Sequence, residues 1–538
     1  MRAIVTSFIL VALFSQPVPA QSRDFSDSRE LWLYYPTNFQ VAENVDKLDA
    51  LWARAAKAGY THVFVVDSKF AKLGDVPDNY FKNLERAKQV ASRLKLKLVP
   101  GLFSVGYSND LLWHDPNLAE GLPVKDALFV VRNGEARVEA DPAVSLDKPS
   151  WKDDSVALDA ANRTATLRGK TEGNSRLSYA LKLPPNRAYH VSVRIRTENF
   201  RGQPEIKALG GKDGRSLNWA NLGVKPTQDW TEHHALFNTL DNTSVTLYFG
   251  VWGGSDGLLE WKDWRIEEAG PTNMLRRPGT PLVVKDEKGG RTLEEGKDFE
   301  PFKDPLAGTK PWNGEFDVWH APPALKTKNV PDGTRLRVSW YHAMTVYDGQ
   351  VSACIAEPKL DELLADQAKR MKQAFGESAA GWMMSHDEFR TLGWCKACEE
   401  SHKSPGQLLA GNAKKCVALL RPGTVYVWND MFDPFHNAVP GPYYLVNGPW
   451  TGSWEGLDKD VVIMNWNHGQ REKSLKFFAD RGHKQVIATY YDDAGLNQTK
   501  DWLKTTAQTP AGVVGYMYTT WRGDYSKMEE FAKLCQGK

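Results

Sequence analysis

The sequence predicts a (β/α)8 barrel of the TIM type that is interrupted by an inserted β-sandwich. Short apolar segments alternate with helix-periodic segments near both ends of the chain, as in the strand–helix units of a parallel sheet. Between residues 143 and 270 the helical periodicity disappears and short alternating strands take over. We therefore expect the first part of the barrel at 21–142, the sandwich at 143–270, a connector at 271–334 and the rest of the barrel at 335–538.

Strand and helix patterns alternate from the start of the first barrel part. Residues 31–35 are a short apolar strand, and a helix follows, with apolar residues at helical spacing (Val45, Leu48, Leu51, Trp52, Ala55) and Gly59 as its stop. Residues 61–66 are β-branched and apolar, residues 80–94 are helix-periodic, and residues 96–99 are a further strand. Repeated units of this kind indicate a parallel sheet.

In the insert, residues 188–197 alternate strictly. One face carries Tyr189, Val191, Val193 and Ile195, and the other carries His190, Ser192, Arg194 and Arg196. Residues 244–252 and 258–266 are similar, with glycine, asparagine and aspartate between them. This architecture resembles the jelly-roll carbohydrate-binding modules of many glycosidases, although a purely structural insert fits the pattern equally well.

Further strands are predicted at 335–341, 381–385, 424–428, 461–466, 485–490 and 512–518. With 31–35, 61–66 and 96–99 this makes nine candidates for the eight places of a barrel. Either 96–99 or 335–341 must lie outside the barrel, and the sequence does not decide which.

Residues 1–20 have the pattern of a secretory signal, since Arg2 precedes an apolar run and Ala20 stands at the expected cleavage point. That run is too short to span a bilayer, and no later stretch is long enough for a membrane helix. We therefore expect export to the periplasm or the extracellular space, with no membrane span. Lysine and arginine number 68 and aspartate and glutamate 66, so the charge favours no nucleic-acid partner.

The chain has five cysteines, of which Cys395 and Cys398 form a Cys-x-x-Cys pair. A zinc site would need two further ligands at suitable spacing, and the sequence shows none nearby. We expect a local disulfide or two packed thiols here, and no metal and no cofactor in the protein.

Carboxylates and aromatic residues gather where the later barrel strands end. They are Asp387 and Glu388, Trp428 and Asp430, Trp466, Tyr491 and Asp492, and Trp521. Active sites of (β/α)8 barrels lie at these carboxyl ends. One acid to protonate a leaving oxygen and flat faces to hold a sugar ring are what a glycosidase needs. The chain's 20 tryptophans agree with this interpretation, although they also suit a core.

This series resembles glycoside hydrolase family 20, the β-N-acetylhexosaminidases, over roughly residues 380–521. The resemblance implies substrate-assisted, retaining cleavage of a 2-acetamido sugar, in which Glu388 is the proton donor and Asp387 orients the acetamido nitrogen. A tyrosine, Tyr491, would hydrogen-bond the acetamido carbonyl. Trp428, Asp430, Trp466, Asp492 and Trp521 would contact an oligosaccharide or polysaccharide substrate. The chain departs from the family in having Ser385 and His386 before the acidic pair, where glycines are usual.

Two alternatives stay open. A glycosidase for another sugar would use two enzyme carboxylates, Glu388 with Asp430 or Asp492, at a separation that depends on the stereochemistry. A barrel that binds glycans without catalysis would leave the Asp387–Glu388 pair flooded with solvent or turned away from the pocket. His386 is expected to support the site or the core.

Overall fold

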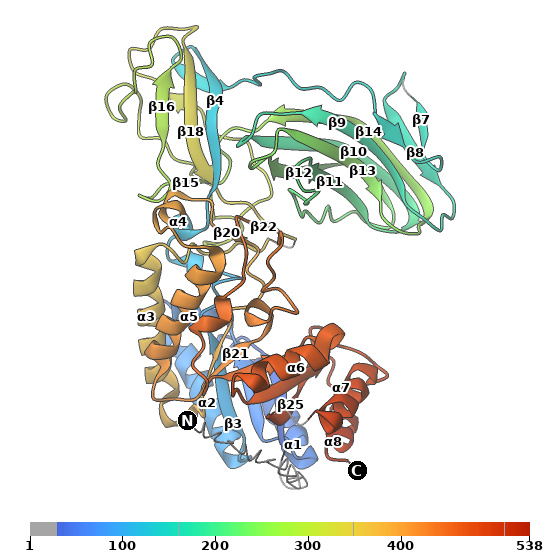
Figure 1. The fold of residues 1–538 in the computed structure, drawn as a ribbon, viewed down its shortest axis with the longest axis vertical. Coiled ribbons are helices and arrows are strands. Elements are labelled where there is room, and N and C mark those ends of the chain that lie inside the picture. Colours follow the sequence, from blue (N-terminus) through green and yellow to red (C-terminus); the bar gives the residue numbers. More distant parts are fainter. Residues whose placement is uncertain (1–28, 160, 348, 510–511, 538) are drawn as a thin grey trace, which may run out of the picture.

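The computed structural model describes residues 29–159, 161–347, 349–509 and 512–537, so the expected leader at 1–20 lies outside the described residues. In this part of the chain the main parts of the fold are a closed barrel, a two-sheet sandwich and a third sheet that lies beside the sandwich (Figure 1). No helix in the described ranges is both long and apolar enough to cross a bilayer.

Eight parallel strands close the barrel, which confirms the expected architecture. In order they are β1 (Glu30–Pro36), β2 (His62–Val66), β3 (Lys97–Leu102), β19 (Trp382–Met384), β21 (Val425–Trp428), β23 (Val462–Asn465), β24 (Gln485–Tyr490) and β25 (Val513–Thr519). The helices of this part are α1 (Ala42–Ala58), α2 (Asp78–Arg93), α3 (Pro358–Phe375), α4 (Lys396–Glu400), α5 (Pro405–Leu420), α6 (Arg471–Asp480), α7 (Asn497–Gln508) and α8 (Met528–Cys535). Alternate strand side chains, such as Met464 and Met517, fill the barrel interior, and the others pack in the core that includes the helices.

The ninth strand candidate, β18 (Arg335–His342), lies outside the barrel, and β3 takes the eighth place. Every second residue of β18 is buried, including Leu336, Val338 and Trp340, whereas β3 is buried continuously from Leu98 onward. Alternation is typical of an antiparallel strand with one covered face, and a continuous run is typical of a parallel strand covered on both. The expectation that 335–538 is all barrel is therefore wrong for its first strand.

The insert is a sandwich of two antiparallel sheets, as expected. One sheet has the order β12 (Gln228–Asn238), β10 (Ala188–Arg201), β14 (Asp256–Glu268), β8 (Thr164–Arg168), β7 (Ala157–Asp159). The other has the order β11 (Pro204–Gly210), β13 (Ser244–Val251), β9 (Ser175–Lys182), β6 (Trp151–Lys152). The predicted inner face of β10 is confirmed, since its side chains are fully buried with those of β13 in one core.

A third sheet, which we call the linking sheet, contains strands that come before the sandwich in the chain and strands that come after it. It consists of β4 (Leu122–Arg132), β5 (Glu135–Val138), β15 (Met274–Leu275), β16 (Val283–Asp286), β17 (Leu325–Lys326) and β18. Three of these strands fall within 271–334, where we expected only a connector, and β4 and β5 fall within 21–142, where we expected the first part of the barrel. The short strands escaped detection because proline, glycine and charged residues surround them.

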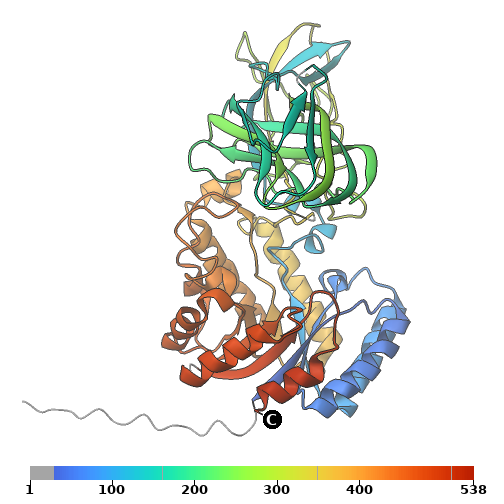
Figure 2. The ribbon, with the colours of Figure 1, turned by 90° about the vertical axis from the view of Figure 1, so that its right-hand side faces the viewer.

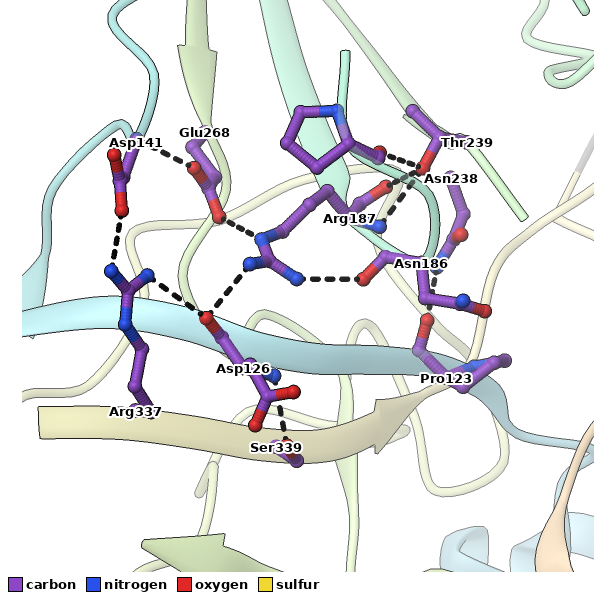
Figure 3. Close-up of polar contacts among 11 residues, drawn as sticks. Pro123, Asp126, Asp141, Asn186, Arg187, Asn238, Thr239, Glu268, Arg337 and Ser339 are labelled. Carbon is purple, nitrogen blue, oxygen red and sulfur yellow. Dashed lines mark hydrogen bonds and ion pairs between the residues drawn. The ribbon is translucent and has the colours of Figure 1, made fainter. Parts of the chain in front are cut away.

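Polar contacts fasten the sandwich to the linking sheet (Figure 3). The Arg187 guanidinium forms a 3.0 Å ion pair with Glu268 and donates a 2.7 Å hydrogen bond to the backbone oxygen of Asp126. Asn238 donates a 3.0 Å hydrogen bond to the backbone oxygen of Pro123 on β4. Arg187 and Glu268 are buried, so each depends on the other for charge compensation.

The sandwich and the linking sheet lie at one end of the barrel (Figure 2). The sandwich core continues onto Met344, Val346 and Leu445, which belong to segments on the barrel side of the junction. Two short strands, β20 (Thr391–Leu392) and β22 (Leu445–Val446), pair in this region. The insert therefore packs against the loops that leave the barrel.

Candidate active site

A cavity of ≈ 1790 Å³ lies at the carboxyl ends of the barrel strands. Residues at or just beyond the ends of all eight barrel strands line it, among them Asn38, Asp67, Ser104, Asp387, Trp428, Trp466, Tyr491 and Trp521. Segments outside the barrel complete the lining with Trp312, Glu315, Tyr347 and Gln350. The cavity is large enough for several sugar rings, since ordinary small-molecule sites measure roughly 300–1,000 Å³.

Asp387 and Glu388 both line this cavity, although adjacent residues of a regular strand would point to opposite sides. Strand β19 ends at Met384, and Glu388 has φ of +48°, so the pair lies in a turn beyond the strand. Gly106 packs against this turn, because a Cβ there would lie 2.0 Å from the backbone oxygen of Asp387. The left-handed backbone at Glu388 is the bend that a cooperating pair requires.

Glu388 is surrounded by polar groups. Its Oε2 accepts a 2.7 Å hydrogen bond from the Tyr107 hydroxyl and lies 2.7 Å from a guanidinium nitrogen of Arg390. Gln350 donates a 2.8 Å hydrogen bond to its backbone oxygen and bonds to Arg390 as well. An arginine and a tyrosine hydroxyl therefore hold the Glu388 carboxylate in place.

Asp387 lies beside Glu388 in a buried position that changes its acidity. Burial and then the nearby charge of Glu388 raise the pKa of Asp387 to about 7. A carboxyl group with this pKa carries a proton for part of the time at neutral pH. Asp387 is therefore a candidate acid at the cavity.

Asp430 is fully buried and does not line the cavity, so its expected contact with substrate is not seen. Its Oδ2 accepts hydrogen bonds of 2.9 Å from the backbone N–H of Glu388 and from Asn437. Its Oδ1 has no hydrogen-bond partner among the described residues. Burial first, and then the charge of Asp387, raise the pKa of Asp430 well above its usual value. Asp430 thus supports the turn that carries Glu388.

Asp492 also lies outside the cavity lining. Its carboxylate accepts a 2.5 Å hydrogen bond from the Thr520 hydroxyl and hydrogen bonds from the backbone N–H groups of Trp521 (3.0 Å) and Arg522 (3.3 Å). The residue stabilises the turn after β25 and does not face the cavity, which corrects its expected role. Its main effect is to place Trp521.

The three expected tryptophans line the cavity together with Tyr491. Trp428 is buried, with 5% of its surface exposed, and its ring packs edge-on against Phe64 in the barrel core. Trp521 is 63% exposed at the mouth, and its ring lies 6.3 Å from that of Tyr491. The ring of Trp466 lies 6.2 Å from Tyr491 on the other side. These rings form a partly open aromatic wall.

Arg390 and Tyr107 are the site residues that sequence reasoning missed. The Arg390 guanidinium carbon lies 5.1 Å from the Tyr347 ring centre and 5.0 Å from that of Tyr444, in addition to its pair with Glu388. Arg390 stands two residues after Glu388, so its position near Glu388 could have been inferred from the sequence. Tyr107 follows β3 and could have been found by treating that strand as part of the barrel.

His386 is fully buried, and its Nε2 lies 3.1 Å from Asn412 Oδ1. Burial lowers the pKa of His386 to about 4, so the ring is neutral at physiological pH. It packs between Phe103 and Phe432, as a supporting residue would. In the described part of the chain, no group of three or more metal-ligating side chains belongs to the cavity lining.

Known proteins give limited comparisons. No protein-family model matches the chain, and no curated protein sequence matches it. Among solved structures, it is similar to the GH20 modules of the pneumococcal exo-β-D-N-acetylglucosaminidase StrH at 9% identity and a TM-score of 0.36, over 95% of this chain and 84% of that one. It is similar to Dispersin B at 14% identity and a TM-score of 0.24, over 35% of this chain and 60% of that one.

A third comparison involves the CBM22-1 xylan-binding domain of Paenibacillus barcinonensis Xyn10C, which is 12% identical. It covers 22% of this chain and 84% of that domain, with a TM-score of 0.18. All of these identities and TM-scores are low.

Proposed function

We propose that the protein is a glycoside hydrolase whose cavity binds an oligosaccharide or polysaccharide. The observation that carries the proposal is Asp387, an acid with pKa about 7 beside the Glu388 carboxylate in a cavity walled by tryptophan rings. Cleavage of a glycosidic bond requires an acid that protonates the leaving oxygen, and aromatic faces suit the C–H faces of sugar rings.

We assign the proton donor to Asp387 and not to Glu388, reversing the assignment that the family resemblance implies. Oε2 of Glu388 is already bonded to Tyr107 and Arg390, whereas Asp387 faces the cavity and holds a proton near neutral pH. The same residue then accepts a proton from water in the second half of the reaction. Arg390 and Tyr107 are positioning residues that hold the Glu388 carboxylate.

For the substrate we propose a 2-acetamido sugar. An adjacent acidic pair, a tyrosine and tryptophans in one cavity suit a reaction in which the substrate's own carbonyl oxygen attacks the anomeric carbon. In this arrangement Tyr491 hydrogen-bonds the acetamido carbonyl and Glu388 faces the acetamido N–H. The ring then lies against the wall formed by Trp428, Trp466 and Trp521.

The alternative mechanisms meet specific obstacles. A second enzyme carboxylate at Asp430 or Asp492 would have to reach the substrate, and neither residue lines the cavity. A barrel that binds glycans without catalysis would not need the desolvation that raises the pKa of Asp387. These observations favour a catalytic pair over both alternatives.

The test is hydrolysis of aryl glycosides with and without a 2-acetamido group. We expect the wild-type protein to cleave the 2-acetamido series, and D387N to lose about 10²–10⁴ in rate, with a smaller loss when the leaving group is good. Asp366→Asn, an exposed surface change on α3, is the matched control and should keep full activity. Absence of hydrolysis of every glycoside by the wild-type protein would refute the proposal.

A further inference from the structure

Three of the five cysteines meet one carboxylate in the interior, outside the cavity lining. Glu120, Cys354, Cys395 and Cys398 are all buried, and one potential ligand atom from each lies within 4.8 Å of all the others. They form the only group of this kind in the described ranges of the chain. The two further ligands that the Cys395–Cys398 pair lacked in the sequence come from distant segments, at Glu120 and Cys354.

We propose that these four residues bind a zinc ion. The Sγ atom of Cys354 lies 3.4 Å from that of Cys395 and 3.7 Å from that of Cys398, and Cys398 Sγ lies 3.4 Å from Glu120 Oε2. Tetrahedral zinc with bonds of about 2.3 Å to sulfur and 2.0 Å to oxygen separates its ligands by about 3.7 Å (S–S) and 3.5 Å (S–O). The spacing of the four ligand atoms is close to that geometry.

The surroundings of the group suit a bound cation. Glu120 uses Oε1 to accept hydrogen bonds from the backbone N–H groups of Trp394 (2.9 Å) and Cys395 (3.0 Å), which leaves Oε2 directed at the sulfurs. Hydrogen bonds of this kind orient a carboxylate ligand. Three thiolates and a carboxylate around Zn²⁺ carry a net charge of −2, and Arg277, 3.6 Å from Cys395 Sγ, offsets part of it.

Ligand chemistry favours zinc over magnesium and calcium. Thiolate sulfur is a soft ligand that magnesium and calcium avoid, and a tetrahedral set with three sulfurs is typical of structural zinc. Four protein ligands leave no open position for substrate, so the ion has a structural role. The cysteines are all free thiols in this structure, with sulfur separations well above the roughly 2.05 Å of a disulfide bond.

The ion would join two segments that connect the barrel with the linking sheet to one loop of the barrel itself. Glu120 lies on the segment from β3 to β4, Cys354 on the segment from β18 back to α3, and the Cys395–Cys398 pair follows the loop that carries Glu388. Gln350, just before Cys354, contacts Arg390 and the backbone oxygen of Glu388. Zinc would thus connect the segment that carries Gln350 with the loop that carries Glu388, both of which line the cavity, from a position outside the cavity.

The experiment measures the metal content of the purified full-length protein after growth with added zinc and dialysis against metal-free buffer. We expect one zinc per chain in the wild type, loss of at least nine tenths in C354S, and full retention in C416S, a buried cysteine outside the group. Five reactive thiols should appear when the wild-type protein is unfolded with a chelator.

A wild-type protein without zinc overturns the proposal, whether it shows five thiols or only the three that a disulfide would leave. If C354S does not fold, E120Q replaces it, since the amide keeps the shape and all three sulfurs but should bind zinc more weakly. Zinc retained in E120Q as tightly as in the wild type removes Glu120 from the ligand set and so contradicts the proposed site.

Discussion

The interior of the sandwich and the mouth of the barrel, where the cavity opens, differ in the kind of side chain that they bury. The sandwich core is built from alternating apolar residues such as Val191 and Leu247, and its buried ion pair, Arg187 with Glu268, lies at the junction. The barrel mouth buries carboxyls without full compensation, as shown by Asp387 and by the unpartnered Oδ1 of Asp430. The difference teaches that the sandwich interior is built for apolar packing, whereas the mouth retains buried carboxyls that are costly and typical of functional sites.

The largest expected effect concerns proton transfer at the mouth. If Asp387 is the donor, kcat/KM should fall as pH rises through about 7, because the acid form is then lost. In D387N this limb should disappear along with about 10²–10⁴ of the rate. In E388Q the limb should move to lower pH, because removal of the neighbouring negative charge lowers the pKa of Asp387.

Measured pH–rate profiles of the three proteins check this prediction. Loss of the limb in E388Q, with its retention in D387N, would instead make Glu388 the donor.

Two of the tryptophans at the mouth, Trp428 and Trp521, are expected to differ in their effects on stability and on substrate binding. Trp428→Ala should cost about 3–5 kcal/mol of unfolding free energy, because this ring is part of the barrel core. Trp521→Ala should leave the melting temperature within a few degrees and weaken substrate binding, because the ring is 63% exposed at the cavity.

Trp151→Ala is the control for Trp521, since that tryptophan is 46% exposed on the sandwich and does not line the cavity. Denaturant unfolding and KM measurements distinguish the cases. An equal loss of binding in the Trp151 and Trp521 variants would contradict the assigned role.

At the junction between the sandwich and the linking sheet, a buried carboxyl group has a raised pKa, as Asp387 has at the barrel mouth. Burial outweighs Arg187 and raises the pKa of Glu268 to about 7, above the 4.5 of the unfolded chain. The folded state therefore binds this proton more tightly, and the contribution of Glu268 to stability declines as pH rises from about 4.5 through about 7. Arg187→Met should steepen that decline, costing about 3–5 kcal/mol at pH 8 and less at pH 5.

Urea denaturation at the two pH values measures the effect. Arg194→Met, an exposed change on β10, the strand that follows Arg187, should cost no more than about 0.5 kcal/mol at either pH. A loss from Arg187→Met that does not depend on pH would contradict the predicted coupling to Glu268.

The smallest expected effect is on the sandwich after its removal from the chain. Residues 143–270 expressed alone should melt cooperatively, because the inner faces of both sheets lie within this fragment. The midpoint should be lower than for the intact protein, since Met344, Val346 and Leu445 no longer cover the core. Near-UV circular dichroism against temperature tests this, and a gradual, non-cooperative melt would show that the insert depends on the linking sheet.

Local pattern in the sequence determined most of the strands. The alternation of β10 and the buried runs of β2 and β24 are properties of neighbouring residues. Gly59 ends α1 in the left-handed conformation, which glycine adopts without steric cost. The position of β18 was also encoded locally, because alternating Arg335, Arg337 and Ser339 mark a strand with one exposed face.

Only the tertiary structure decided what the site residues do. Asp430 and Asp492 follow barrel strands as a substrate-binding residue would, yet backbone N–H groups of neighbouring loops occupy their carboxylates. Tyr107, which donates a hydrogen bond to the Glu388 carboxylate, and Glu120, which lies beside the three cysteines, come from segments hundreds of residues away in the chain. Hydrogen bonding and burial between such segments depend on how they pack. The residue types at the strand ends therefore predicted which side chains lie near the cavity, but not which carboxylates are left without protein partners and can contact a substrate.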